Sequence, residues 1–386
     1  MPIDPALIEF ASRFRIAPPI GSISPLGRGL INDTYRLESG GRDYVLQRIN
    51  GHVFPEPERI MANLSRLARH PDRPESLGLR VPVLIQAHDG ASFVRDDAGA
   101  VWRLMEFIPD TCNLSRLQDE TQACEVGRVL GRFHRWTAVL PSADFAVTLP
   151  GYHDTPSYLE RLRALFDPSV ATPSGSVRPG PDPTASEITA LQSFIEARSD
   201  LAEALDRAVQ SGRIAPRLTH GDPKLDNILF DRDGRRALAL IDLDTVQPGL
   251  IQHDLGDCLR SCCNALGEGE TDPSKVRFDL ALAEAILTGY AEATRGWLGE
   301  DDIDCLFDGI RVMPFELGLR FLTDHLQGDR YFKVDRPGRN LVKARIQFAL
   351  VADIERREPA IRAAIEAAFH PVSGRPSATG PLRGSA

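Results

Sequence analysis

The chain has 386 residues, of which 42% are hydrophobic and 26% charged, and its formal net charge is −9. Such a length suits one large or two ordinary domains with true hydrophobic cores. The excess of acidic residues argues against nucleic acid as the main partner. No apolar run is long enough to span a membrane, and the N-terminus lacks a basic region before an apolar one. We therefore expect a cytoplasmic protein without a membrane partner.

Residues 1–107 are predicted to form a small lobe rich in β-strands. In chain order the patterns are a strand, a glycine turn and a returning strand over 26–37, a strand over 44–49, a helix over 56–70, and strands near 92–94 and 101–107. Gly27 and Gly29 lie in the first turn, where the absence of side chains lets backbone amides approach phosphates. Glycines also make ordinary hairpins. We interpret the lobe as nucleotide-binding, with both glycines at the nucleotide.

Arg48 and Asn32 are further candidates in this lobe. Arg48 lies on the third predicted strand, where a protein kinase carries the lysine that grips the nucleotide phosphates, and arginine supplies a permanent charge. Its neighbour Gln47 is predicted to face the other side of the strand. Asn32 follows the glycine turn and is predicted to reach the nucleotide or the acceptor. A strand arginine is also a common surface residue, so both interpretations of Arg48 stay open.

Helical periodicity dominates residues 108–370, after a predicted hinge at 108–110. Helices are predicted over 120–137 and 187–210, and the segment 168–186, rich in Pro, Ser and Gly, is predicted to be a surface loop. The helix over 120–137 has an apolar stripe made of Ala123, Val126, Val129, Leu130 and Phe133. Residues 371–386 have almost no apolar content and are predicted to be a disordered tail. We expect residues 108–370 to form a catalytic and acceptor-binding lobe.

The most informative segment is His220-Gly221-Asp222-Pro223-Lys224-Leu225-Asp226-Asn227, followed by an apolar strand that ends at Asp242. Kinase-type phosphoryl transfer needs a carboxylate that accepts the proton of the attacking hydroxyl, and oxygen ligands that hold Mg²⁺ against the phosphates. The chain offers Asp222 as the base, and Asn227 and Asp242 as Mg²⁺ ligands. Lys224 is predicted to reach the γ-phosphate and balance its charge. Each residue alone also suits a turn or a loop, but the combined pattern favours an ATP-dependent kinase.

Two more residues of this region are predicted to be structural. His220 is expected to fix the loop through hydrogen bonds rather than to transfer protons. Asp254 opens a predicted helix, so it is expected either to cap that helix or to accept hydrogen bonds from the backbone of the catalytic loop.

Glu316, Arg320 and Asp324 follow one another every four residues in a helical segment. Such spacing forms ion pairs on a helix surface, worth about 0.2–0.5 kcal/mol each. The neighbours Phe315 and Leu319 are apolar, which indicates partial burial instead. A buried arginine between two carboxylates can present hydrogen bonds to a polar substrate. We therefore predict that Arg320 and Asp324 contact the substrate.

Several longer motifs cover both predicted lobes. They occupy residues 29–35, 44–50, 53–54, 152–156, 241–249, 316–324 and 328–333. This set resembles the N-acetylhexosamine 1-kinases, within the wider aminoglycoside phosphotransferase and choline kinase group, and the resemblance runs from about residue 26 to residue 356.

The resemblance implies an α+β, bilobal, protein-kinase-like fold with a small β-rich N-terminal lobe and a larger helical C-terminal lobe. It also implies ATP- and Mg²⁺-dependent phosphorylation of the anomeric C1 hydroxyl of N-acetylglucosamine or N-acetylgalactosamine. The base of that family corresponds to Asp222, and its Mg²⁺ ligands correspond to Asn227 and Asp242. The catalytic loop departs from the family pattern at three positions, Gly221, Pro223 and Asp226.

Two other functions stay open. The first is a kinase of the same fold that acts on an aminoglycoside, an amino alcohol or another sugar. Acidic clusters at 268–272 and 300–302 would suit a cationic acceptor of this kind if they line its pocket. The second is a nucleotide-binding regulator without catalysis, which the complete set of Asp222, Asn227 and Asp242 disfavours.

Overall fold

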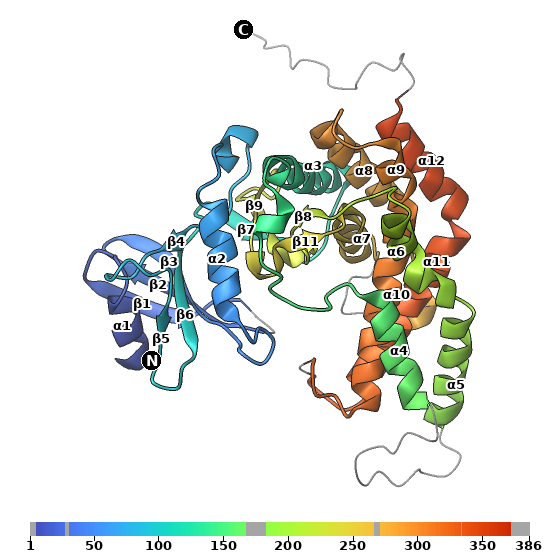
Figure 1. Ribbon diagram of the computed structural model, residues 1–386, viewed down its shortest axis with the longest axis horizontal. Helices are drawn as coiled ribbons and strands as arrows, with labels where there is room; N and C mark the ends of the chain where they lie inside the picture. Colours follow the sequence, from blue (N-terminus) through green and yellow to red (C-terminus); the bar gives the residue numbers. More distant parts are fainter. Residues whose placement is uncertain (1–4, 28–30, 167–182, 266–270, 333, 372–386) are drawn as a thin grey trace.

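The computed structural model describes residues 5–27, 31–166, 183–265, 271–332 and 334–371. Figure 1 shows a β-sheet, a larger, mainly helical part, and the helix α2 (Pro57–Leu67) between the two. The α+β arrangement implied by the resemblance is thereby confirmed. Among the described residues, no helix is both long enough and apolar enough to cross a bilayer.

In the described part of the chain, the first sheet is antiparallel and has six strands in the order β1-β2-β3-β6-β4, with β5 beside β6. The elements of this lobe are α1 (Pro5–Ser12), β1 (Ile20–Pro25), β2 (Asp33–Ser39), β3 (Arg42–Arg48), α2 (Pro57–Leu67), β4 (Leu84–Ile85), β5 (Val94–Arg95) and β6 (Val101–Glu106). The predicted position of the first strand is wrong, because β1 ends at Pro25 and its pairing with β2 brings Pro25 opposite Tyr35. The pairing of β3 with β6 places Gln47 opposite Arg103.

The chain enters the helical lobe through β7 (Thr111–Asn113), which pairs with β9. The other elements are α3 (Glu120–Thr137), α4 (Thr155–Phe166), α5 (Pro183–Glu196), α6 (Ala204–Gln210), β8 (Arg217–Thr219), β9 (Ile228–Asp231), β10 (Ala237–Leu240), β11 (Gln247–Gly249), α7 (Ile251–Cys262), α8 (Leu280–Thr294), α9 (Glu300–Asp304), α10 (Leu306–Leu326), α11 (Arg339–Arg356) and α12 (Glu358–Phe369). Two small sheets, β10-β9-β7 and β11-β8, carry the segments between β8 and α7.

The predicted helix over 187–210 is wrong as a single element. The α-helix ends at Glu196, and a 3-10 turn over Ser199–Glu203 packs on α4 and α10 before α6 begins. At its other end α5 begins at Pro183, inside the predicted loop over 168–186, and residues 167–182 lie outside the described part of the chain. The predicted tail also lies outside it, except for Pro371.

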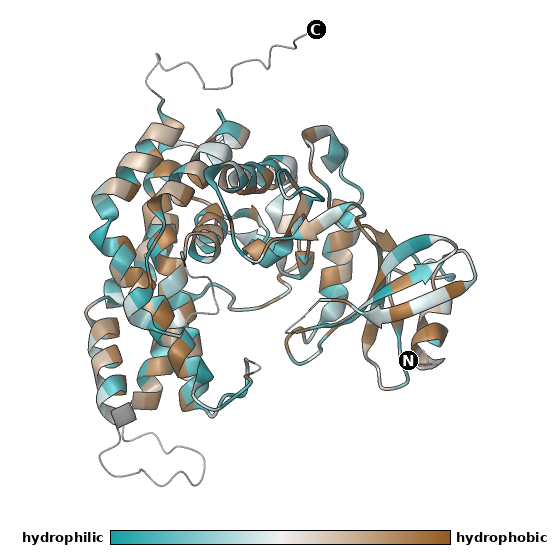
Figure 2. Cartoon of the chain, turned by 180° about the vertical axis from the view of Figure 1, so that it is seen from behind, coloured by the Kyte–Doolittle hydropathy of each residue, from teal (hydrophilic) through white to brown (hydrophobic). Residues whose placement is uncertain are grey.

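The hydrophobic cores join the two lobes through α2. One core lies under the sheet and includes Leu37, Leu46 and Leu104. The apolar face of α2 belongs instead to the largest core, together with residues of α3, β9, β10, α7 and α8. Figure 2 shows hydrophobic and hydrophilic residues in alternating bands along the helices. The buried Asn63 of α2 adds hydrogen bonds of 2.8 and 2.9 Å to the carbonyls of Ala146 and Val246. The helix therefore holds the sheet against the helical lobe.

Helix α3 forms as its pattern predicts. Its N-cap Asp119 accepts a 2.8 Å hydrogen bond from the backbone N–H of Gln122, which satisfies a free helix donor. The predicted apolar stripe is fully buried and is thus confirmed. Helix α8 packs against this helix with three glycines at the contact, Gly127, Gly131 and Gly289, and a Cβ at Gly127 would meet the carbonyl oxygen of Ile286 at 1.9 Å. Only glycine permits this approach.

We predict that Gly127→Ala destabilises the protein by at least about 1–3 kcal/mol, since overpacking a rigid helix contact outweighs the roughly 1 kcal/mol that alanine gains in helix propensity. Gly51→Ala is the control, because a Cβ at Gly51 meets no atom within 4 Å. Urea unfolding of both variants checks the prediction. Equal midpoints for the two variants would contradict the close packing of α3 on α8.

Candidate active site

A cleft of about 770 Å³ lies between the sheet and the helical lobe. Its walls come from β2, β3 and β6 on one side, and from the β8–β9 loop, the segment after β10, α7, α10 and α11 on the other. Seven of the residues singled out from the sequence line it: Gly27, Asn32, Asp222, Lys224, Asn227, Asp242 and Arg320. The cleft therefore brings most of the predicted site together. Gly29 lies outside the described residues.

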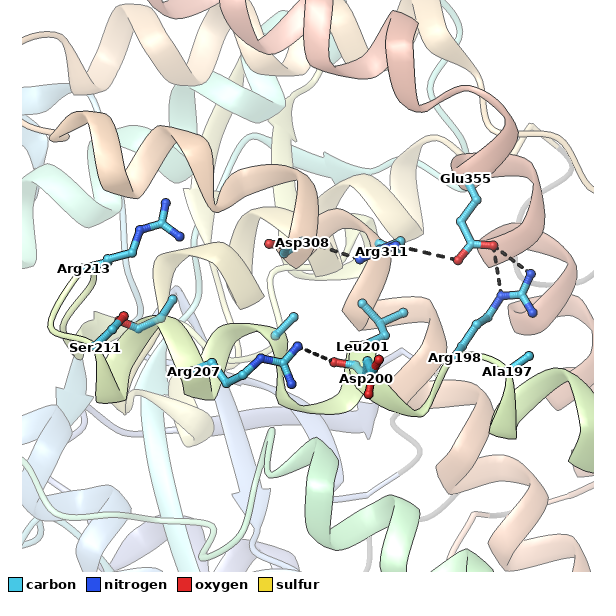
Figure 3. A pocket seen from close by; sticks show the side chains of 12 residues that line it. Ala197, Arg198, Asp200, Leu201, Arg207, Ser211, Arg213, Asp308, Arg311 and Glu355 are labelled. Carbon is cyan, nitrogen blue, oxygen red and sulfur yellow. Dashed lines mark hydrogen bonds and ion pairs between the residues drawn. The ribbon is translucent and has the colours of Figure 1, made fainter.

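A second hollow, of about 600 Å³, lies among α5, α6, α10 and α11 (Figure 3). It contains none of the predicted site residues. Each arginine that lines it has a nearby carboxylate, the pairs being Arg198–Glu355, Arg207–Glu203, Arg213–Asp301 and Arg311–Asp308. Its charges are thus largely balanced, and we place the candidate active site in the cleft between the lobes.

Asp254 of α7 holds the catalytic loop through hydrogen bonds to the loop backbone. Its carboxylate is 1% exposed and accepts hydrogen bonds from the backbone N–H groups of His220 at 2.6 Å and Gly221 at 2.8 Å. The ring of His134 contacts the same carboxylate at 2.9 Å. Burial works against the charge of Asp254, but these partners still bring its pKa below the usual value. Of the two predicted roles, the contact with the loop backbone is confirmed, whereas Leu250 is the N-cap of α7.

His220 is structural, as predicted. Its Nε2 lies 3.0 Å from the carbonyl oxygen of Ile241, and its Nδ1 accepts a hydrogen bond from the N–H of Asp222 at 3.3 Å. A ring that donates with one nitrogen and accepts with the other is neutral, and burial lowers the pKa of His220. The next residue, Gly221, has a φ of 86°, and its Cβ would meet Thr245 at 2.8 Å. Backbone geometry therefore explains this departure from the kinase loop that the chain resembles.

The loop presents Asp222 to the cleft with two partners. Lys224 Nζ lies 2.5 Å from Asp222 Oδ2. Asn227 Nδ2 donates to the carbonyl oxygen of Asp222 at 2.8 Å and to Oδ2 at 3.1 Å, which leaves Asn227 Oδ1 as the amide atom suited to a cation. Lys224 and Asn227 therefore both contact the carboxylate of Asp222.

Asp242 stands where a cation would be expected. It has a φ of 64°, which turns the chain sharply after β10, and its side chain opens onto the cleft. The surrounding protein removes much of its hydration, and this burial, with the repulsion of Asp244 and Asp222, raises its pKa to about 7. Among the described residues, no group of three or more His, Cys, Asp or Glu side chains forms a metal cluster. A site of one carboxylate and the amide of Asn227, completed by phosphates and water, fits Mg²⁺ nonetheless.

The predicted orientations of Arg48 and Gln47 are wrong. Arg48 lies beside Asp33 at 3.6 Å and Asp96 at 3.9 Å, its side chain is 44% exposed, and it does not line the cleft. Gln47 lines the cleft and accepts hydrogen bonds from Arg103 of β6. Because neighbours on a strand alternate between faces, only one of the two can face the cleft, and the pairing of β3 with β6 selects Gln47.

Asn32 lines the cleft, but both ends of its amide bind protein groups. Its Nδ2 donates to Asp244 Oδ2 at 2.8 Å, and its Oδ1 accepts the N–H of Asn50 at 3.0 Å. Asp244 in turn pairs with Arg103 at 2.6 Å, with both side chains almost fully buried. Asn32 therefore joins the sheet to the segment that carries Asp242, instead of reaching freely toward a ligand.

The far end of the cleft contains the helix residues predicted from their four-residue spacing. The guanidinium of Arg320 lies 5.3–5.9 Å from the ring centres of four aromatic residues, Tyr152, Tyr158, Tyr331 and Phe332. Among the described residues its carboxylate neighbour is Glu316, at 3.9 Å. The prediction of partial burial is confirmed, since the side chain of Arg320 is 15% exposed.

Glu316 pairs with His153, which sequence reasoning missed. Nδ1 of His153 lies 3.0 Å from Glu316 Oε1, and Nε2 lies 3.1 Å from the carbonyl oxygen of Gly221. Both ring nitrogens face acceptors, which favours the imidazolium. Burial opposes that charge, but Glu316 raises the pKa of His153 above its usual value. Burial likewise opposes the charge of Glu316, whose pKa His153 and Arg320 bring to about 2.

The structure contradicts direct contact of Asp324 with the cleft. Its carboxylate is 3% exposed and accepts the backbone N–H groups of Arg330, Tyr331 and Phe332 at 2.8–2.9 Å. Asp324 lies at the end of α10, where the N–H groups of the following loop are nearer to its carboxylate than the cleft is. Asp324 acts on the cleft only by holding the loop that presents Tyr331 and Phe332.

Arg103 was also missed, although the sequence contains a signal for it. It interrupts the apolar run of β6, Val101-Trp102-Arg103-Leu104-Met105, and a charged residue within such a strand must find a buried partner. For His153 the signal is weaker, because its partners Glu316 and Gly221 lie far from it in the sequence.

Comparisons with known proteins agree with this geometry. Residues 22–298 match the model of the phosphotransferase enzyme family. Similar solved structures include an aminoglycoside phosphotransferase from Alicyclobacillus acidocaldarius (TM-score 0.62, 16% identity, 96% of this chain and 98% of that one) and a microcompartment-associated aminopropanol kinase (0.62, 17%, 92% and 98%). A spectinomycin phosphotransferase bound to ADP and spectinomycin is also similar (0.57, 15%, 93% and 100%). At these identities the structures show the shared fold alone. The family match covers more than half of the chain, which therefore belongs to the phosphotransferase enzyme family.

Proposed function

We propose that this phosphotransferase uses ATP and Mg²⁺ to phosphorylate a sugar, most specifically the anomeric C1 hydroxyl of an N-acetylhexosamine. The observation that supports a sugar is the balance of charge at the acceptor end of the cleft. The proposal also draws on the motifs at 152–156 and 316–324, which meet there: His153 and Thr155 both hydrogen-bond Glu316.

Three of the carboxylates that line the cleft have a cationic partner. Glu316 pairs with His153 at 3.0 Å, and Asp222 pairs with Lys224 at 2.5 Å. The third pair is Asp257–Arg260, at 2.7 Å. These pairs leave little negative charge to attract a polycation, and Arg320 adds positive charge to the same end. A neutral acceptor rich in hydroxyl and carbonyl groups suits such a wall better than an aminoglycoside or an amino alcohol does.

The acidic clusters that suggested a cationic acceptor do not line the cleft where they are described. Asp301 pairs with Arg213 at 2.9 Å, Asp302 pairs with Arg217 at 2.7 Å, and Glu300 lies beside His370. Thr271 and Asp272 of the other cluster are likewise absent from the described cleft wall, and residues 268–270 lie outside the described chain. The described residues of these clusters therefore give no support to a cationic acceptor.

In the proposed reaction Asp222 orients the acceptor hydroxyl and accepts its proton as the acceptor oxygen bonds to the γ-phosphorus and the bond from that phosphorus to the bridging oxygen breaks, releasing ADP. Lys224 leaves Asp222 and contacts the transferred phosphoryl group instead. Asn227 and Asp242 would hold Mg²⁺, which when bound neutralises charge on the phosphates. Arg320 donates hydrogen bonds to an oxygen of the sugar, and the surrounding aromatic residues exclude water.

The acceptor is tested by initial rates with N-acetylglucosamine, N-acetylgalactosamine, glucose, galactose, their 1-O-methyl glycosides, an aminoglycoside and an amino alcohol. We expect turnover of an N-acetylhexosamine and none of its methyl glycoside, which lacks the nucleophile. A pocket that hydrogen-bonds the acetamido group should also disfavour glucose by orders of magnitude. Turnover of the methyl glycoside, or fast transfer only to an amine-bearing acceptor, would refute the proposal.

Asp222→Asn should lower kcat by at least about 10²-fold, because the amide preserves the loop but cannot accept the proton. ATP affinity should remain near that of the wild type. Asp233→Asn, in the exposed turn between β9 and β10, is the control for expression and folding. Turnover close to wild type in the Asp222 variant would remove this residue from the mechanism.

We predict a pH effect from the pair of His153 and Glu316. A histidine whose pKa is raised above 6.5 on folding keeps the pair intact below 6.5, and the pair is lost as pH rises through the raised value. The KM for the acceptor should therefore increase as pH rises through the raised pKa of His153, with little change in the KM for ATP.

Glu316→Gln should move the onset of this increase to lower pH, since the charge that raises the pKa of His153 is gone. The surface variant Glu358→Gln, which loses an exposed pair with Arg362, is the control. The test measures the KM for the acceptor as a function of pH in the wild type, in Glu316→Gln and in Glu358→Gln. Identical profiles would show that the pair has no part in acceptor binding.

A further inference from the structure

The sheet side of the cleft has an unusual source of positive charge. Among the described residues of the N-terminal lobe that line the cleft, Arg103 is the only Arg, Lys or His. Protein kinases place a lysine on the third strand for the α- and β-phosphates, paired with a glutamate of the following helix. In this chain the cleft-facing residue of β3 is Gln47, and Glu58 of α2 pairs with Arg95 of β5.

Arg103 is held in a defined orientation. Its Nε and Nη2 donate to Gln47 Oε1 at 2.9 and 2.6 Å, and Nη2 lies 2.6 Å from Asp244 Oδ1. Asn32 holds the other oxygen of Asp244 at 2.8 Å. A guanidinium fixed on one edge in this way loses little freedom when its other edge binds a ligand.

The remaining nitrogen of Arg103 has no partner. Nη1 is buried and makes no hydrogen bond among the described residues, although the whole side chain is only 1% exposed. An unsatisfied donor of a buried charged group is costly and calls for a specific explanation. Its position on the cleft wall, near the segment that carries Asp242, indicates that the missing partner is an oxygen of the ligand. Guanidinium groups match phosphate oxygens especially well.

We propose that Arg103, supplied by β6, binds the nucleotide phosphates in place of a lysine on β3, and that Gln47 and Asp244 position it. This inference rests on the proposed use of ATP. A simpler role also exists, in which Arg103 only clamps the lobes together through Asp244. The two roles predict different effects of replacing Arg103: if it binds phosphates, the loss of affinity depends on the number of phosphates in the ligand, and if it only clamps the lobes, the loss is the same for every ligand.

The test is the affinity of wild type, Arg103→Met, Arg103→Lys and Arg48→Met for ATP, ADP, AMP and adenosine, measured by calorimetry without Mg²⁺ so that the metal ligands contribute little. We expect Arg103→Met to lose at least tenfold in affinity for ATP and ADP, with adenosine within twofold of wild type. Arg103→Lys should recover part of the loss. Arg48→Met should behave as wild type, because its side chain lies outside the cleft.

Asp244→Asn separates the two roles further. A clamp would be broken in this variant, and the affinities for ATP and adenosine would fall together, whereas a phosphate-binding Arg103, still oriented by Gln47 and by the amide oxygen that replaces the carboxylate, keeps its preference for ATP over adenosine. If Arg103→Met does not fold because Asp244 is left buried and unpaired, the double variant Arg103→Met/Asp244→Asn removes both charges and is measured in the same way.

Equal losses for ATP and adenosine, or a loss confined to Arg48→Met, would overturn the inference while the proposed function stands. If the wild type binds ATP no better than adenosine, the nucleotide donor itself is wrong, and the proposed function fails with the inference.

Discussion

The buried carboxylate of Asp254 is the constraint on which the arrangement of the site depends. It accepts the backbone N–H groups of His220 and Gly221, so the loop that presents Asp222 has one allowed position relative to α7. His134 of α3 supplies the compensating partner. Leaving such a buried acceptor without a partner typically costs about 1–3 kcal/mol, and more when the acceptor is charged. The catalytic loop is therefore held by the core of the helical lobe and does not depend on contacts made by the substrate.

At both ends of the cleft, too, a buried charged side chain has partners from segments that are far apart in the sequence. Glu316 of α10 joins His153 and, through it, the carbonyl of Gly221. Arg103 and Asp244 join the sheet to the segment after β10. Each pair can form only when the two segments that it joins have folded next to each other. The geometry of the site therefore depends on the fold of both lobes. The pair of Glu316 and His153 also balances charge at the proposed acceptor end of the cleft, and this balance supports an uncharged acceptor.

What could be predicted from the sequence was mostly local. The catalytic loop and the strand leading to Asp242 lie close together in the chain, and their spacing defines their chemistry. The apolar stripe of α3 was equally readable, because a helix repeats every few residues. Arg320 was found for the same reason, since the four-residue spacing placed it on the helix face that lines the cleft.

The rest required contacts that no local pattern contains. Two adjacent residues of a strand face opposite sides, so the choice between Gln47 and Arg48 depended on the pairing of β3 with β6. Arg103 has its partners on β3 and beyond β10, far from it in sequence. Asp324 has the right spacing for the cleft, but it lies at the end of α10 beside a loop whose free N–H groups bind it.

The central claim, that the cleft transfers phosphate to an uncharged sugar, can be tested in one mixture. The enzyme is given ATP, Mg²⁺ and equal concentrations of N-acetylglucosamine, N-acetylgalactosamine and a polycationic aminoglycoside, and the products are identified by phosphorus NMR. The balanced charges of the acceptor end predict a sugar phosphate whose phosphorus couples to the anomeric proton, with the aminoglycoside unmodified. Phosphate found mainly on the aminoglycoside would contradict the account.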